Sequence, residues 1–327
     1  MSVASGRSSR GGSGEGRVQL RVEQAGPLAL LQDAGRFGVR RLGVTQGGPV
    51  DIHAWAWANH LLDNRWGAAT LEITFGGLSL IAEGNARLAL AGADLEATLD
   101  DEPIEPWSRF EVQAGQRLRF GAPKDGLRAY LAAPGGFLAE PVLGSVAGVT
   151  REGLGGHDGQ GGKLQKGDAL VFQQGHIEND ELPEAPSADK RPDYSQPTRL
   201  ALVPGAQIAD FESRSLFAAF NHPWQVDDRA DRMGVRLTGP LLKCAVSSMI
   251  SEGIGLGAVQ VPPDGQPIVL LNDRQTIGGY PRLGTLTPLA CAQLAQCLPG
   301  HEVHLQAQAL SAAQEEYRDF LRLFRAD

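Results

Sequence analysis

The sequence has few of the residues that would tie it to an oxidising compartment, a membrane or a nucleic acid. Its 327 residues include three cysteines, which form no CxxC pair, so we expect reduced thiols in a cytoplasmic protein. No apolar run approaches the roughly 20 residues of a membrane span. The net charge of −8 comes without the clustered Lys and Arg that bind nucleic acid. We therefore expect neither a membrane nor a nucleic acid as partner.

Common nucleotide, metal and nucleophile motifs are also missing. Residues 156–165 lack the first glycine and the Ser or Thr of a P-loop, and residues 253–258 lack the GxGxxG spacing. No His, Cys and carboxylate set has metal-ligand spacing, and there is no GxSxG elbow. No lysine lies in a biotin-attachment context. The sequence therefore predicts no metal site and no covalent biotin on this chain.

Glycine is abundant, and this predicts a mainly β fold. The 42 glycines are nearly twice the usual share of about 7%, which favours tight turns and short strands. Short, mostly alternating segments predict strands at residues 87–92, 109–115, 116–121, 127–133 and 168–173. We expect few helices, at residues 47–64, 212–220 and 312–325, the last from an apolar stripe at Tyr317, Phe320, Leu321 and Phe324.

Four segments recur in the same order in the two halves of the chain, which indicates an internal duplication. The pairs are "RFGVR" (36–40) and "RMGVR" (232–236), "EITFGG" (72–77) and "EGIGLG" (252–257), "LALAGAD" (88–94) and "IVLLNDR" (268–274), and "AGQRLRF" (114–120) and "PGHEVHL" (299–305). We expect two β-barrel-like domains, and the helix at 47–64 is an insertion in the first copy.

Two changes in composition set the predicted domain boundaries. Residues 1–17 lack the hydrophobic segment of a secretory signal and predict a disordered tail. Residues 176–197 are acidic and proline-rich, which predicts an exposed linker. The first domain, with an extension, is then expected at 18–175, and the second, with the C-terminal helix, at 198–327.

Residues 270–286, "LLNDRQTIGGYPRLGTL", place charged side chains where an apolar strand ends. Buried charges must be bonded or must line a cleft. Asp273 could serve as an acid or base with Arg274 binding an anion, or the two could form a salt bridge that fixes a turn. Asp231 and Arg232 adjoin a second predicted strand and raise the same question.

Three further positions leave two interpretations open. Gln260 lies in an apolar strand that Glu252 begins, and its amide either faces solvent or binds a polar ligand. Gly47 and Gly48 precede the inserted helix, so their N–H groups could bind an anion with Arg36, which otherwise serves a turn. The helix face of His53, Trp57 and His60 is explained more simply by partial burial than by a metal.

Four long stretches together resemble the biotin-dependent carboxyltransferase-type family. They are "QDAGRFGVRRLGVTQGGPVD" (32–51), "LGSVAGVTREGLGG" (143–156), "DRMGVRLTGP" (231–240) and "SEGIGLGAVQVPPDGQPIVLLNDRQTIGGYP" (251–281). This family includes the C subunit of 5-oxoprolinase, proteins called allophanate hydrolase subunit 2, and part of urea amidolyase. The similarity covers residues 18–310, with departures at Ala230 and Ile277, where the family has Ser and Thr.

The resemblance implies two cyclophilin-like β-barrels and one subunit of a heteromeric enzyme. With two partners, a cyclophilin-like B subunit plus a separate A subunit, such a chain hydrolyses 5-oxo-L-proline to L-glutamate at the expense of ATP with Mg²⁺, and is expected to be inactive alone. Two alternatives are a biotin-dependent carboxyltransferase for a urea-like amide and a non-enzymatic regulatory partner of a cyclophilin-like kinase inhibitor.

The chemistry of such a reaction suggests roles for the polar residues of the second half. Opening a lactam that carries a carboxylate requires activation, for example phosphorylation of the amide oxygen, in a dry pocket with cationic groups and a proton-carrying carboxylate. We expect Arg274 and Arg232 to bind anions. The expected acids or bases are Asp273, Glu252 and Asp231, and the expected substrate-orienting residues are Gln260, Gln275, Thr276 and Tyr280.

Overall fold

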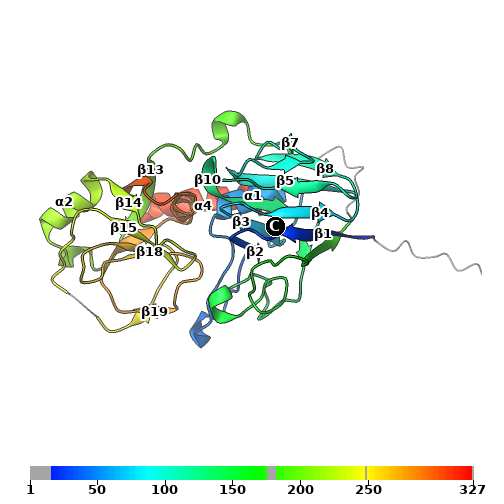
Figure 1. Cartoon of the computed structure of the whole chain (residues 1–327). Coiled ribbons are helices and arrows are strands. Elements are labelled where there is room, and N and C mark those ends of the chain that lie inside the picture. Colours follow the sequence, from blue (N-terminus) through cyan, green and yellow to red (C-terminus); the bar gives the residue numbers. More distant parts are fainter. Residues whose placement is uncertain (1–15, 175–181, 247–248, 326–327) are drawn as a thin grey trace, which may run out of the picture.

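The computed structural model describes residues 16–174, 182–246 and 249–325. Strands dominate it, in two β units that lie side by side with helices between them (Figure 1), which confirms the predicted mainly β fold. Most of the predicted tail and the start of the predicted linker lie outside the described residues. The first strand begins at Arg17, within the predicted tail.

The first β unit consists of two antiparallel sheets around one core. The strand order is β11-β12-β1-β4-β9-β6-β7 in one sheet and β2-β3-β10-β5-β8 in the other. Leu20 and Leu80 of the first sheet share a core with Ile73 and Leu131 of the second. The strands are β1 Arg17–Gln24, β2 Leu28–Gln32, β3 Thr70–Thr74, β4 Ser79–Ala82, β5 Ala86–Asp94, β6 Thr98–Leu99, β7 Glu102–Pro103, β8 Ser108–Val112, β9 Arg117–Arg119, β10 Asp125–Ala132, β11 Phe137–Leu138 and β12 Ala169–Gln173.

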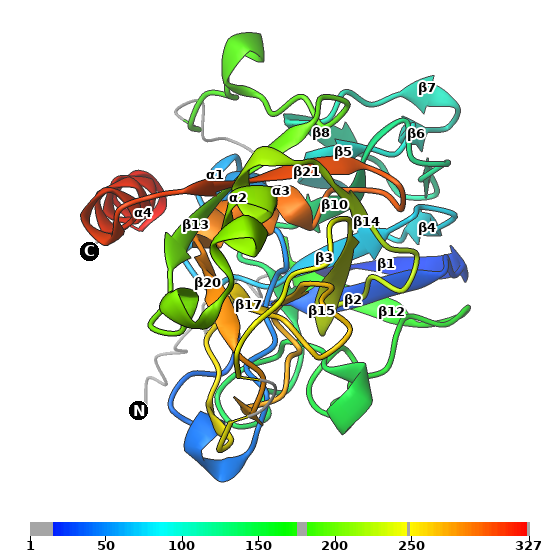
Figure 2. The ribbon, with the colours of Figure 1, turned by 90° about the vertical axis from the view of Figure 1, so that its left-hand side faces the viewer.

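The second β unit is a closed barrel with its own core (Figure 2). Its strand order is β13-β20-β17-β18-β15-β14-β21, and the parallel pairing of β13 with β21 completes the ring. A separate two-stranded sheet, β16 with β19, projects from it. The strands are β13 Thr198–Pro204, β14 Trp224–Val226, β15 Gly234–Thr238, β16 Glu252–Gly253, β17 Ala258–Gln260, β18 Ile268–Leu270, β19 Ile277–Gly278, β20 Arg282–Leu286 and β21 Glu302–Ala307.

All three predicted helices are present, and a fourth was not predicted. The predicted ones are α1 Ile52–His60, α2 Ser213–Asn221 and α4 Leu310–Phe324. The unpredicted α3 Pro288–Leu294 carries two start signals, because Thr287 accepts a hydrogen bond from the N–H of Ala290 and proline occupies the first turn. Short 3-10 helices lie at η1 Arg40–Leu42, η2 Thr150–Glu152, η3 Ala188–Lys190 and η4 Ile208–Asp210.

The C-terminal helix α4 packs against α1 of the first unit, although the sequence placed it with the second domain. The ring of Phe324 lies 5.1 Å from Trp57 and 5.4 Å from His60, and Phe320 lies 6.3 Å from His53. These contacts confirm that partial burial explains the aromatic face of α1. Because α4 follows β21 of the second unit in the chain, these contacts also connect the two units.

The described part of the predicted linker is mostly exposed, but it is anchored to the first unit. The carbonyl of Pro183 accepts a 2.6 Å hydrogen bond from Arg109, and the N–H of Tyr194 donates to Asp125 at 3.4 Å. Tyr194 also packs into the apolar cluster around α1. The linker therefore lies along the first unit, because its few apolar residues find partners there.

The repeated segments fall on unequal local structures. Residues 114–120 and 299–305 share a turn followed by a strand, and Gly115 and Gly300 have positive φ angles of 91° and 81°. By contrast, residues 36–40 lie in a connection that enters η1, whereas residues 232–236 enter the barrel strand β15. The two units also differ in sheet arrangement, so the duplication stays a prediction.

The contact between α4 and α1 makes a stability prediction. Phe320 is 7% exposed, so Phe320→Ala should lower the free energy of unfolding by about 3–5 kcal/mol through lost burial and a residual cavity. Leu323→Ala on the same helix is the control, because Leu323 is 55% exposed and its loss should change stability by less than about 0.5 kcal/mol. Urea unfolding measures the unfolding free energy of both variants. Equal losses would show that the contact between α4 and α1 does not stabilise the fold.

Candidate functional site

The connection between β2 and α1 lies against the second β unit through its own carbonyl groups. The side-chain amide of Asn272 donates to the carbonyl oxygens of Gly47 at 3.2 Å and Pro49 at 2.9 Å. Arg232 donates to the carbonyl of Gly48 at 2.8 Å. Gly47 has φ 65°, and a Cβ there would lie 2.9 Å from Val149 of the first unit, so the path of this connection requires glycine.

Arg232 is the centre of a buried ion cluster that joins the two units. Its Nε and Nη2 donate to the two carboxylate oxygens of Asp273 at 2.9 and 3.0 Å, and its Nη1 donates to Glu72 of β3. Glu72 also accepts from the hydroxyl of Tyr130 at 2.7 Å. We call Arg232, Asp273, Glu72 and Tyr130 the Arg232 cluster. Although burial opposes it, the two carboxylates raise the pKa of Arg232.

The cluster continues to the N-terminus of α1. The N–H of Asp51 donates to the Tyr130 hydroxyl at 2.9 Å, and the Asp51 carboxylate caps the helix by accepting from Ala54 at 2.9 Å. Gln296, just after α3, donates to the other Asp51 oxygen at 2.6 Å. Burial raises the pKa of Asp51 to about 6. The positive end of this helix is therefore already occupied by a carboxylate of the chain itself.

At the predicted anion site, Gly48 and Arg36 are already bonded within the chain, although the Nη1 of Arg36 has no partner among the described residues. The N–H of Gly48 donates to the side-chain oxygen of Gln32 at 3.1 Å, while its carbonyl faces Arg232. Arg36 is fully buried and donates to backbone carbonyls, including that of Val142 at 3.0 Å. Its role is the alternative that the sequence left open, which is to fix a turn.

The three predicted acids lie apart, and each is already bonded. Both oxygens of Asp273 accept from Arg232. Asp231 is exposed and accepts from the backbone N–H groups of Met233 at 2.8 Å and Gly234 at 3.0 Å, as in an Asx turn. Glu252 is paired with Arg282 at the surface. In this geometry Arg232 and Asp273 bond each other, and the anion-binding and acid-base roles that we expected for them stay predictions.

The predicted substrate-orienting residues also differ in setting. Gln260 is 3% exposed, so it does not face solvent, and its Nε2 has no hydrogen-bond partner among the described residues. Tyr280 is 42% exposed, and Gln275 is half-buried. Thr276 lines a surface cavity, to which Arg274 lies close. These residues therefore do not converge on one point.

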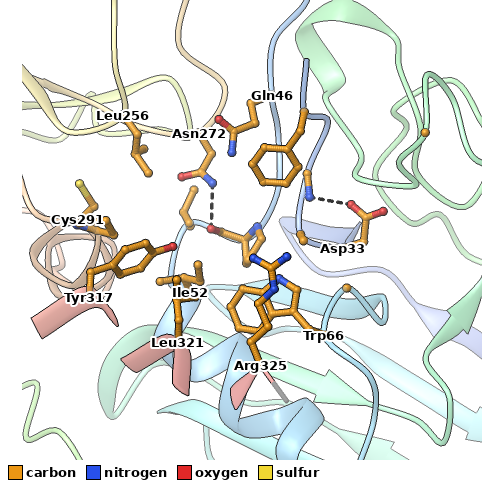
Figure 3. Close-up of a pocket in the computed structure, with 18 residues that line it drawn as sticks. Asp33, Gln46, Ile52, Trp66, Leu256, Asn272, Cys291, Tyr317, Leu321 and Arg325 are labelled. Carbon is orange, nitrogen blue, oxygen red and sulfur yellow. Dashed lines mark hydrogen bonds between the residues drawn. The ribbon is translucent and has the colours of Figure 1, made fainter. Parts of the chain in front are cut away.

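A cavity of about 610 Å³ lies between the two units, beside the Arg232 cluster (Figure 3). Its walls are largely apolar, and its polar groups come from far-apart segments. Figure 3 labels ten of its lining residues: Asp33, Gln46, Ile52, Trp66, Leu256, Asn272, Cys291, Tyr317, Leu321 and Arg325. Apolar walls with a few converging polar groups are typical of a small-molecule site.

Few of the cavity's polar groups are already engaged. Asp33 accepts from Gly35 at 2.9 Å and from Val146 at 2.8 Å, so its carboxylate holds a loop. The side chains of Gln46 and Arg325 make no hydrogen bond within the described chain, and the Asn272 Oδ1 accepts none there. The hydroxyl of Tyr317 also makes no hydrogen bond within the described chain, so the free set is two amides, one hydroxyl and one guanidinium.

The polar residues of this cavity were not predicted as site residues, although each lies next to or within a segment that the sequence singled out. Asn272 directly precedes Asp273, and Gln46 lies beside the predicted glycine site. Tyr317 belongs to the apolar stripe of α4, and Arg325 ends the predicted helix. No spacing rule could have joined them, because the cavity forms only where α4 crosses to the first unit.

The sequence profile of a known family, "Carboxyltransferase domain, subdomain A and B", matches residues 42–307. The chain belongs to this family. It is 37% identical to the C subunit of 5-oxoprolinase from Escherichia coli K12, over 93% of this chain and 97% of that protein. It is 34% identical to the Haemophilus influenzae protein of the same name, over 87% of this chain and 90% of that one.

A solved carboxyltransferase relative shares the arrangement of the two units. The crystal structure of the K. lactis urea amidolyase superposes with a TM-score of 0.80 and 26% identity over 93% of this chain. The chain spans only 20% of that much longer enzyme. It therefore corresponds to one portion of the amidolyase.

Three general features complete the description of this carboxyltransferase-family chain. Within the parts of the chain that the structure describes, no His, Cys, Asp and Glu residues form a group placed to hold a metal ion. No described helix combines the length and apolar character needed to cross a bilayer. All three cysteines are free thiols.

The Arg232 cluster predicts a pH-dependent stability change. Arg232→Met leaves Glu72 and Asp273 buried without a cation, which should cost about 3–5 kcal/mol of unfolding free energy at pH 8. The loss should shrink near pH 5, because carboxylates whose folded pKa is raised are stabilised by protonation as the pH falls. Urea unfolding at the two pH values measures it.

Arg236→Met on strand β15 is the matched control. Its partner Asp264 has a side chain that is 51% exposed, so this surface pair should contribute no more than about 1 kcal/mol. Equal losses for the two arginines, or a loss for Arg232→Met that does not shrink at low pH, would contradict the role given to the cluster.

Proposed function

We propose that this chain is the C subunit of an ATP-dependent 5-oxoprolinase, which hydrolyses 5-oxo-L-proline to L-glutamate. Its expected partners are a cyclophilin-like B subunit plus a separate A subunit. The likeness to two proteins that carry the name of this 5-oxoprolinase component, over nearly their whole length, supports the proposal. The cavity between the units is the place where we put the substrate.

The single observation that carries the proposal is the orientation of Asn272. Its Nδ2 donates to the carbonyls of Gly47 and Pro49, so its Oδ1 must be the atom left to the cavity. A lactam N–H needs such an acceptor. Gln46 offers a second amide for the lactam oxygen, so the two side chains suit both edges of one amide.

Arg325 and the apolar walls suit the rest of the same substrate. 5-Oxoproline carries a carboxylate next to its lactam, and a guanidinium binds a carboxylate through two parallel hydrogen bonds. Trp66 and Leu321 line the cavity near Arg325, so they would shield a bound carboxylate from water on that side and strengthen the interaction. The ring of Trp66 also offers an apolar face to the lactam ring.

Activation of the amide requires a group that this chain does not supply by itself. When bound, ATP with Mg²⁺ supplies the phosphoryl group that makes the amide carbon reactive towards water. The described residues fit a phosphate at a second cavity, which Arg40 and Arg41 line. The acid or base for ring opening would come from the partner proteins, because Asp231, Glu252 and Asp273 are all engaged and none of them borders the cavity.

A biotin-dependent carboxyltransferase for urea is the second candidate. The structural likeness to the K. lactis urea amidolyase favours it, and urea presents the same amide edges to Gln46 and Asn272. Urea has no carboxylate, however. The contribution of Arg325 therefore separates the two functions.

We predict that Arg325→Gln raises the KM for 5-oxoproline at least about tenfold, because a hydrogen bond to a charged group contributes about 1.5–3 kcal/mol. The assay is 5-oxoproline-dependent ADP release by the chain co-expressed with its two cognate partners. Arg322→Gln is the control on the same helix, because its side chain is 77% exposed and only meets Asp319. An unchanged KM would contradict the proposed contact between Arg325 and the substrate carboxylate. Turnover of urea that is the same in the wild type and in Arg325→Gln would favour the carboxyltransferase.

The same preparation tests the need for partners. The isolated chain should show no 5-oxoproline-dependent ADP release, and adding the two partner proteins should restore it. Asn272→Ala in the complex should reduce kcat/KM by about tenfold or more, since an unpaired buried lactam N–H loses its acceptor. Full turnover by the isolated chain would contradict the proposed role in a complex.

A further inference from the structure

A second cavity lies where η1 of the first unit meets the β16–β19 sheet of the second. Its volume is about 620 Å³. The lining residues are Arg40, Arg41, Gly43, Gly253, Ile254, Gly255, Thr276 and Ile277. Two of its side chains are cationic and none is acidic.

A third arginine lies directly behind this cavity. Arg274 is 3% exposed and donates from its Nε to the carbonyl of Ile254 at 3.3 Å. Arg40 donates to the same carbonyl from the cavity side, and to that of Thr276 at 3.4 Å. Two guanidinium groups therefore share one backbone oxygen, although like charges repel at this separation.

The only carboxylate that acts on Arg274 within the described residues is that of Asp273, which raises its pKa from a distance without forming an ion pair with it. Arg40, Arg41 and Arg274 form no ion pair there, whereas neighbouring arginines do: Arg232 with Asp273, Arg236 with Asp264 and Arg282 with Glu252. Burial and the charge of Arg40 lower the pKa of Arg274 to about 10. Arg40 is half-buried and Arg41 is exposed, so both can reach an anion that enters the cavity, while the buried Arg274 adds positive charge behind it.

The backbone around the arginines leaves room for such an anion. Gly43, Gly253 and Gly255 have no atom within 4 Å of the position that a Cβ would take, so this side of the cavity is open. The N–H of Gly255 makes no hydrogen bond with the described residues and is available as a donor. Guanidinium groups and free N–H groups together are the donors that hold phosphate oxygens.

We propose that Arg40, Arg41 and Arg274 form a site for a phosphate group, either free or at the end of a nucleotide. Arg40 and Arg41 contact the anion from the two sides of η1, and Arg274 neutralises it from beneath through its long-range charge. The inference rests on the charge balance of this cavity and not on the proposed function, so it is tested on the isolated full chain.

The wall between the two cavities gives the phosphate site a place near the substrate. Ile254 and Gly255 line the second cavity, and the next residue, Leu256, lines the first. Arg274 lies behind Ile254 and close enough to Cys291 of the first cavity to affect the pKa of that thiol. A phosphate in one cavity and an amide in the other would thus be separated by this one segment of chain.

Isothermal titration of the purified chain with inorganic phosphate at neutral pH and low salt tests the site. We expect binding that Arg41→Gln and Arg40→Gln each weaken by at least about tenfold, since each removes a charged hydrogen bond. Arg318→Gln on α4 is the control, because this exposed arginine contacts only Gln314, at 3.5 Å. Phosphate should also raise the melting temperature of the wild-type chain but not of Arg41→Gln, whose side chain makes no contact needed for folding.

Titrations with ATP identify the source of the phosphate. If ATP displaces phosphate and binds more tightly, the site binds a nucleotide. If ATP does not displace phosphate, the site binds free phosphate. No binding by the folded wild-type chain, binding that both arginine variants keep, or displacement of phosphate by 5-oxoproline would overturn the proposal. A chain that binds phosphate but supports no 5-oxoproline-dependent ADP release with its partners would retain this site and lose the proposed function.

Discussion

The structure depends on one buried cation. Arg232 belongs to the barrel of the second unit, yet one of its two carboxylate partners, Glu72, lies on a central strand of the first. A guanidinium that is withdrawn from water must be fully bonded, and here two carboxylates and the carbonyl of Gly48 complete its set. The requirement fixes the distance between the units, because neither carboxylate can retreat without leaving a charge unpaired.

The fixed distance explains the features around it. The connection through Gly47 and Gly48 lies against the second unit because its carbonyl groups accept hydrogen bonds from Asn272 and Arg232. The carbonyl groups of this connection orient Asn272, and that orientation decides which amide atom faces the cavity. The helix α4 closes the cavity from the other side by packing on α1. The bonds that fix the position of Arg232 therefore also help to decide which atoms of Asn272 face the cavity.

Local signals in the sequence predicted the elements, and non-local contacts decided the site. The apolar stripe at Tyr317, Phe320, Leu321 and Phe324 predicted a helix at residues 312–325, and α4 spans Leu310–Phe324, because this spacing depends only on neighbouring residues. The charges at the end of β18 also had to be bonded or line a cleft, as expected. Which alternative applied to Asp273 depended on Arg232, 41 residues away, and that partner cannot be read from spacing. Asn272 was passed over for the same reason, since a neutral amide carries no pattern until its carbonyl partners are known.

The nature of the cavity also limits the chemistry that this chain can perform. Cys291 lines it and looks like a nucleophile, yet burial raises the pKa of its thiol to about 12, and the charge of Arg274 opposes this only in part. The thiolate is the reactive form of cysteine, so at neutral pH this side chain is an apolar wall. Asp33 is held by a loop, and the Arg232 cluster has no free carboxylate oxygen facing the cavity. What remains in the cavity are two amides, the hydroxyl of Tyr317 and a guanidinium. In the reaction that we propose, such a set orients an amide, so an activating group and a partner surface would supply the attack and the proton transfer, which is consistent with the name that the relatives carry, a subunit of 5-oxoprolinase.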